Sequence, residues 1–178
     1  MQWLNEPAQW SDQGGVLKVT ADAATDFWQV TGYGYSRDNG HLYGERLAGD
    51  FDLSMRVRGS YAAQYDQAGA MVRVDERRWL KTGIEYFDGG MRFSTVITLD
   101  HSSWALAGLP AVMTELGLRL TRRGDAVEVR YCVDAGDFEL AALAYLPPDH
   151  EVLAGAMCAA PEGGGFDVAF TDLAITAR

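Results

Sequence analysis

Apolar and polar residues alternate along several stretches of the chain, which is the pattern of a β-sheet with one buried face. The alternation is clearest in residues 117–121 and 126–132, where leucines and valines take every second position. The segment between them, Arg122–Asp125, is short and polar. The two stretches are therefore predicted to form a β-hairpin.

Similar strand-like runs recur along the rest of the chain, separated by turns rich in glycine and aspartate. Helix-forming sequence is scarce: Ala141–Leu146 is rich in alanine, but it is short and is followed at once by Pro147 and Pro148. These patterns predict an all-β protein of roughly 12–14 strands with little helix. They favour a single domain over residues 1–178, built as two packed antiparallel sheets in a sandwich or jelly roll.

Two turns make specific predictions about strand pairing. Asn39-Gly40 is the dipeptide typical of a type I′ turn, which predicts a hairpin between Tyr33–Ser36 and His41–Tyr43. A tight turn at Asp75–Arg78 would pair the strands on either side of it. In that register Glu85 lies opposite residues 67–69.

Composition narrows the function classes. The 178 residues include 20 glycines and carry a formal net charge of -10, with a pI of about 4.6. Such a charge disfavours nucleic acid as a partner, because binding to phosphates needs clustered Lys and Arg. The sequence has no apolar run long enough for a membrane span and no secretory signal at its start, so we expect a cytoplasmic protein.

Metal and cofactor motifs are not evident. Cys132 and Cys158 are predicted to be buried, reduced thiols, and the three histidines have no ligand-like spacing relative to them. Gly163–Gly165 is not followed by the Lys-Ser/Thr of a phosphate loop. The sequence therefore predicts no metal, no cofactor and no complete catalytic motif.

A set of short motifs occurs in a characteristic order along nearly the whole chain. They are Thr25-Asp26-Phe27-Trp28, Tyr33-Gly34, Asp38-Asn39-Gly40-His41, Tyr65-Asp66-Gln67-Ala68-Gly69, Trp79-Leu80-Lys81-Thr82-Gly83-Ile84-Glu85 and Gly165-Phe166. The sequence thereby resembles the uncharacterised bacterial and fungal family of "regulation of enolase" proteins. The resemblance implies a concanavalin A-like jelly roll with one concave sheet, but it implies no enzymatic activity. Residues 68–83 are also similar to the sandwich domain appended to some bacterial β-xylosidases, which points to glycans.

Candidate binding residues share one face of the strand Trp79–Phe87. Side chains alternate across a strand, so Trp79, Lys81 and Glu85 point one way while Leu80 and Ile84 point the other. An aromatic ring beside charged groups is typical of a sugar groove. The alternative is a solvated outer face with a surface salt bridge.

Other candidates lie outside that strand. Asp66 and Gln67, next to Tyr65, have the short multidentate side chains that bind sugar hydroxyls, although Asp66 could instead cap a turn. His41 and Trp104 are further candidates, and each of them could equally be structural.

We therefore expect a non-enzymatic protein that binds a carbohydrate or small metabolite on the concave sheet and that has a regulatory role in sugar metabolism. One alternative is a glycoside hydrolase or lyase that uses Glu85 with a second carboxylate such as Asp66 or Glu76. Another is a protein-interaction module that acts on a metabolic enzyme. Exposed sheet edges would also allow a homodimer.

Overall fold

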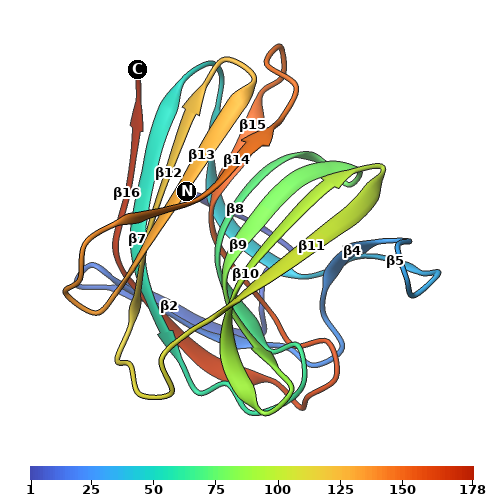
Figure 1. The fold of residues 1–178 in the computed structure, drawn as a ribbon, viewed down its shortest axis with the longest axis vertical. Helices are drawn as coiled ribbons and strands as arrows, with labels where there is room; N and C mark the ends of the chain where they lie inside the picture. The colour runs from blue at the N-terminus through green and yellow to red at the C-terminus, as the bar shows by residue number, and fades with distance from the viewer.

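The computed structural model describes all residues 1–178 and contains sixteen β-strands in two seven-stranded antiparallel sheets and one two-stranded ribbon (Figure 1). Sheet 1 has the order β1 (Gln2–Leu4), β6 (His41–Leu47), β15 (Val152–Ala159), β8 (Gln67–Asp75), β9 (Arg78–Phe87), β10 (Gly90–Leu99) and β11 (His101–Gly108). Sheet 2 has the order β14 (Glu139–Tyr145), β13 (Ala126–Val133), β12 (Leu116–Arg123), β7 (Phe51–Gly59), β16 (Phe166–Ala177), β3 (Val16–Ala21) and β2 (Gln9–Gln13). The ribbon consists of β4 (Phe27–Gln29) and β5 (Ser36–Asp38).

The architecture is the two-sheet all-β sandwich that the sequence predicts. The strand count exceeds the expected 12–14 because β1, β4 and β5 have only three residues each. Segments that short carry no readable alternation. The structure has no helix that could cross a membrane.

Sheet 2 follows the period-2 pattern closely. In β7 the residues Phe51, Leu53, Met55 and Val57 are at most 2% exposed, and they pack against sheet 1. The predicted hairpin is confirmed as β12 and β13, which are paired down to Arg123 opposite Ala126. Alternating side chains on this sheet therefore supply half of the main core.

Sheet 1 is buried on both faces. From β9, Leu80 and Ile84 enter the main core between the two sheets, while Trp79 points to the opposite face and is fully buried there. All eight residues of β15 are buried. Something other than sheet 2 must therefore cover the outer face of sheet 1.

The cover is the segment of residues 22–40, which includes β4 and β5 and which we call the covering segment. Figure 1 shows it on the side of sheet 1 that is away from sheet 2. It is held on the sheet by the amide of Gln29, which donates to Ser102 Oγ at 2.9 Å, and by the Asp38–Arg73 ion pair at 2.6 Å. Phe27 and Trp28 from this segment pack over Trp79 in a second, smaller hydrophobic cluster.

The prediction of a hairpin at Asn39-Gly40 is wrong, because the segments on either side of this dipeptide do not pair with each other. β5 pairs with β4, whereas β6 pairs with β1 and β15, so the dipeptide links two different sheets. The side chain of Asn39 accepts the amide of Asp26 and donates to the carbonyl of Ala24. A Cβ at Gly40 would lie 2.5 Å from the Phe27 ring. Close packing, rather than turn geometry, explains the glycine.

Cys132 and Cys158 are both buried and free, as the sequence predicts. Burial raises the pKa of the Cys158 thiol, so this group stays protonated and inert.

Candidate functional site

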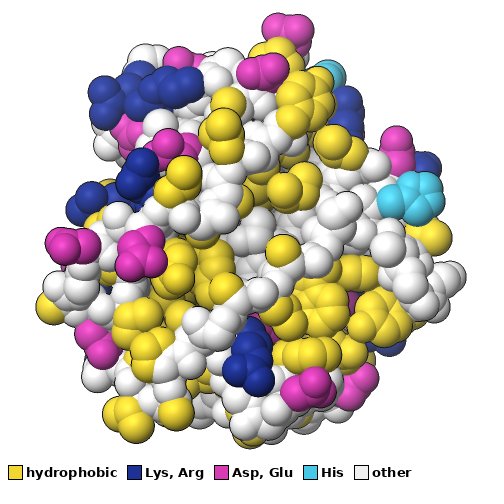
Figure 2. Space-filling model, in the orientation of Figure 1, with side chains coloured by type: hydrophobic (Ala, Val, Ile, Leu, Met, Phe, Trp, Pro, Cys, Tyr) yellow, Lys and Arg dark blue, Asp and Glu magenta, His cyan; other side chains and the backbone are white.

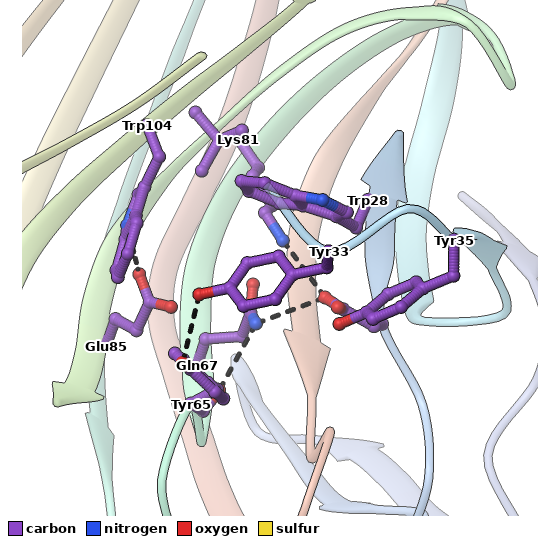
Figure 3. Close-up of a pocket in the computed structure, with 10 residues that line it drawn as sticks. Trp28, Tyr33, Tyr35, Tyr65, Gln67, Lys81, Glu85 and Trp104 are labelled. Carbon is purple, nitrogen blue, oxygen red and sulfur yellow. Dashed lines mark hydrogen bonds and ion pairs between the residues drawn. The ribbon is translucent and has the colours of Figure 1, made fainter. Parts of the chain in front are cut away.

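A pocket lies on the outer face of sheet 1, beneath the covering segment (Figure 3). Its walls come from the covering segment, from the start of β8 and from β9, β10 and β11. The lining residues are Asp26, Trp28, Tyr33, Tyr35, Tyr65, Gln67, Lys81, Glu85, Val96 and Trp104. Figure 2 shows hydrophobic side chains gathered on this part of the surface, where Figure 1 places β4 and β11.

Strand alternation and glycine together create the space. Lys81 and Glu85 project from the same face of β9, and Gly83 between them contributes no side chain. Gly69 on β8 is its cross-strand partner. A Cβ at Gly83 would lie 2.2 Å from the Ala68 carbonyl oxygen. This part of the pocket floor is therefore bare backbone.

A buried ion pair organises one side of the pocket. Lys81 Nζ donates to Asp26 Oδ1 at 3.2 Å and to the Phe27 carbonyl at 2.7 Å, and both charged side chains are at most 7% exposed. The amide of Gln67 also donates to Asp26 Oδ1. Asp26 and Lys81 therefore fix the covering segment to β9 by a charge-assisted contact.

Glu85 stands on the other side of the pocket. It is 6% exposed, and its Oε2 accepts the indole N–H of Trp104 at 2.9 Å. Burial raises the pKa of Glu85, and the positive charge of Lys81 and the hydrogen bonds from Ser94 and Trp104 offset the effect only in part. A buried carboxyl with a perturbed pKa inside a pocket marks a candidate functional group.

Four aromatic rings enclose the pocket in a closed circuit, and each ring stands steeply to the next. The pairs are Trp28–Trp104 (6.5 Å, 88°), Trp104–Tyr65 (6.2 Å, 65°), Tyr65–Tyr33 (6.3 Å, 75°) and Tyr33–Trp28 (5.5 Å, 70°). We call these four side chains the aromatic box. Tyr35 stacks on Tyr33 from outside this circuit.

The outer wall of the box belongs to a loop. Tyr33 lies between Gly32 and Gly34, both with φ near +74°, and its hydroxyl is hydrogen-bonded to that of Tyr65 at 3.0 Å (Figure 3). This hydrogen bond, together with burial, raises the pKa of the Tyr33 phenol. Tyr33 and Tyr35 are 46% and 39% exposed. They are the solvent-facing part of the lining.

The space inside is small. The volume open to the centre of a water molecule is about 20 Å³. That is room for about one water-sized group. The site is therefore narrow, and its solvent-facing side is formed by the two exposed tyrosines.

Comparison with known proteins identifies the family of this chain. Residues 3–178 match the family described as "Protein of unknown function (DUF1349)". The Saccharomyces cerevisiae protein named "Regulation of enolase protein 1" is 38% identical over 175 residues, which are 98% of this chain and 88% of the yeast protein. The chain belongs to this family.

Solved structures share this fold. A Saccharomyces cerevisiae protein described as functionally unknown superposes with a TM-score of 0.94 at 37% identity, over 99% of this chain and 96% of that one. The GH43 protein BlXynB of Bacillus licheniformis gives a TM-score of 0.70 at 13% identity, over 97% of this chain and 36% of that one. The carbohydrate binding module CBM66 from Bacillus subtilis gives a TM-score of 0.61 at 15% identity, over 98% of this chain and 95% of that module. The family shares its β-sandwich with domains of these types.

The structure brings together five of the eight residues proposed from the sequence as binding residues: Tyr65, Gln67, Lys81, Glu85 and Trp104. The predicted register is confirmed, because Gln67 is the cross-strand partner of Glu85.

Trp79, His41 and Asp66 do not line the pocket. Trp79 is covered completely by the covering segment, and its indole N–H donates to the Glu76 carbonyl. Its ring therefore packs in the second cluster and has no open face for a sugar.

His41 and Asp66 have structural contacts. His41 Nε2 accepts the Asp22 amide, so Nδ1 must carry the proton that it donates to the Asn5 carbonyl at 2.6 Å. Asp66 Oδ2 accepts the amides of residues 62 and 63, which makes Asp66 a turn cap.

The remaining lining residues, Asp26, Trp28, Tyr33, Tyr35 and Val96, were not among the candidate binding residues taken from the sequence. The alternation of glycine with tyrosine in Gly32-Tyr33-Gly34-Tyr35 was the available signal for an aromatic loop. No group of three or more His, Cys, Asp or Glu side chains is placed to hold a metal ion.

Proposed function

We propose that the protein binds a carbohydrate or another small metabolite in the pocket on the outer face of sheet 1, and that it acts without catalysis. The observation that supports this most directly is an aromatic box closed over polar groups that have free hydrogen-bonding capacity. Aromatic walls with a few convergent polar groups are typical of small-molecule sites. The fold shared with a carbohydrate binding module supports the carbohydrate class.

A regulatory role in sugar metabolism is part of the same proposal. Its support is the name of the yeast relative, "Regulation of enolase protein 1". A protein that binds a metabolite without converting it would suit such a role.

The test is titration calorimetry of the purified protein with a panel of neutral, acidic and amino monosaccharides. Trp104→Ala removes one wall of the box, and Trp10→Ala is the matched control because Trp10 is exposed and is not part of the pocket lining. We expect at least one ligand, whose affinity falls at least about tenfold in Trp104→Ala, or about 1.4 kcal/mol. The control should keep full affinity. Equal affinity in both variants would exclude this pocket as the site.

A glycoside hydrolase is the second candidate, because two carboxyl groups line one pocket. They are Glu85 and Asp26, whereas Asp66 and Glu76, the partners considered from the sequence, are not in the lining. The raised pKa of Glu85 is what a general acid requires. The counter-observation is that Asp26 Oδ1 is occupied by Lys81 and Gln67.

Release of nitrophenol from aryl glycosides separates the two candidates. We expect no turnover above background. Turnover that is lost in Glu85→Gln and retained in Glu45→Gln, a change at an exposed glutamate, would favour the hydrolase.

A further inference from the structure

Three charged side chains line the pocket, Asp26, Lys81 and Glu85, and their two negative charges outnumber the one positive charge. Asp26 and Lys81 form an ion pair, and both are nearly inaccessible. Glu85 is equally buried, but it forms no ion pair with Lys81. Arg92, the cross-strand neighbour of Glu85, forms none with it either. A buried carboxylate without a countercharge is costly. With Glu85 ionised the three groups therefore sum to one negative charge, and the Lys81 charge offsets the burial of Glu85 only in part.

Hydrogen-bonding capacity is unbalanced in the same direction. Three carboxylate or amide oxygens of lining residues have no hydrogen bond within the protein: Asp26 Oδ2, Gln67 Oε1 and Glu85 Oε1. Lys81 already uses two of its three N–H donors on Asp26 and Phe27. The free groups at Asp26, Gln67 and Glu85 are therefore acceptors, while the remaining donors are one Lys81 N–H and tyrosine hydroxyls. A ligand group that satisfies these three acceptors must donate.

The aromatic box strengthens the preference for positive charge. A cation within about 6 Å of an aromatic ring centre is attracted by the negative face of the ring. The four rings of the box lie 5.5 to 6.5 Å from their neighbours, so a group between them is close to several rings at once.

Size restricts the group further. About 20 Å³ of open volume admits a headgroup of water size and not a whole sugar ring. A primary ammonium has this size, one positive charge and three N–H donors. Those properties match the missing charge and the three free acceptors.

We propose that the pocket binds the ammonium group of a primary amine, with Glu85 as its counter-ion and Asp26 and Gln67 as further acceptors. This inference rests on the proposed function, and within the carbohydrate class it selects amino sugars with a free amine. The rest of the ligand extends outward past Tyr33 and Tyr35.

The pH dependence of binding follows from the surroundings of Glu85. The titratable and charged groups around it are Lys81 on the same strand, Asp26 and Tyr33 from the covering segment, Tyr65 before β8, and Arg92 on β10. Ammonium binding needs ionised Glu85, and burial raises the pKa of this group. Affinity should therefore fall as the pH drops through that raised value. Protonation of the free amine increases in the same direction and would raise affinity, so a fall can be assigned to the protein.

The experiment is titration calorimetry with glucosamine, galactosamine and mannosamine, each compared with its parent hexose and its N-acetyl derivative. Tetramethylammonium is added as a cation without N–H donors. We expect at least one free amine to bind at least about tenfold tighter than both neutral counterparts at pH 7, or about 1.4 kcal/mol. The preference should weaken as the pH is lowered. It should be lost in Glu85→Gln and retained in Glu45→Gln.

Each other outcome has a defined meaning. If hexoses or their N-acetyl derivatives bind as tightly as the amines, the ammonium inference is overturned while the proposed binding function stands. Tetramethylammonium binding more tightly than every primary amine also overturns it, since the free acceptors would then be irrelevant. No binding by any compound overturns both proposals. If Glu85→Gln does not fold, the pH dependence of the unaltered protein decides, because a preference that only rises as the pH is lowered contradicts a role for ionised Glu85.

Discussion

The inner and outer faces of sheet 1 are both buried, but they are covered in different ways. The inner face packs on the regular strands of sheet 2 and contains almost entirely apolar side chains. The outer face is covered by a segment with only two short strands, and it keeps Asp26, Lys81 and Glu85 within the cover. Regular sheet packing leaves no space for a ligand, whereas a loop-built cover leaves a pocket with unpaired polar groups. The same strand, β9, serves both faces through the alternation of its side chains.

The largest expected effect on stability comes from breaking the buried ion pair between Lys81 and Asp26 on the outer face. Lys81→Met leaves Asp26 buried without its cation, which should lower the free energy of unfolding by about 3–5 kcal/mol. Chemical denaturation measures the loss. Lys18→Met is the matched control, because Lys18 is an exposed lysine with no ion pair, and it should change stability by less than about 0.5 kcal/mol.

The double variant Asp26→Asn with Lys81→Met should recover part of that loss, because no uncompensated charge remains. A double variant as unstable as the single one would show that the pair is not what holds the covering segment.

The next effect belongs to the inner face. Leu80→Ala removes a fully buried side chain from the main core, which should cost about 2–5 kcal/mol in denaturation experiments. Leu143→Ala, at a position that is 69% exposed, is the control and should be nearly neutral. Because Leu80 points away from the pocket, its loss should leave ligand affinity unchanged. A large drop in affinity would mean that the two faces are coupled.

The smallest effect concerns the aromatic loop. Tyr33→Phe removes the hydroxyl that is hydrogen-bonded to Tyr65, which should cost about 1 kcal/mol or less. Global stability should hardly change, but the amides of Val30 and Gly34, which donate to carbonyls within the loop, should exchange faster with deuterium. Tyr35→Phe is the control, because the Tyr35 hydroxyl has no hydrogen bond in the protein. Identical exchange in the two variants would show that the Tyr33–Tyr65 contact does not close the pocket.

The pairing of β9 could be predicted from the sequence, whereas the residues that the covering segment brings to β9 could not. The register of Glu85 against Gln67 followed from a short turn and the strand pattern. The sequence could not show that the covering segment would bury Trp79 and bring Asp26 to Lys81, 55 positions away. The hairpin at Asn39-Gly40 was predicted incorrectly because pairing with distant strands outweighed a local turn preference.

The sequence by itself determined the two-sheet fold, the family and the residues that share a face of β9. Period-2 alternation and turn chemistry are local, so they can be seen in a string of residues. Only the tertiary structure decided which of those residues face an open space. That depends on where a loop distant in sequence comes to rest, and on whether a buried charge such as Glu85 finds a partner there. Such outcomes are set by contacts across the fold, and no pattern along the chain records them.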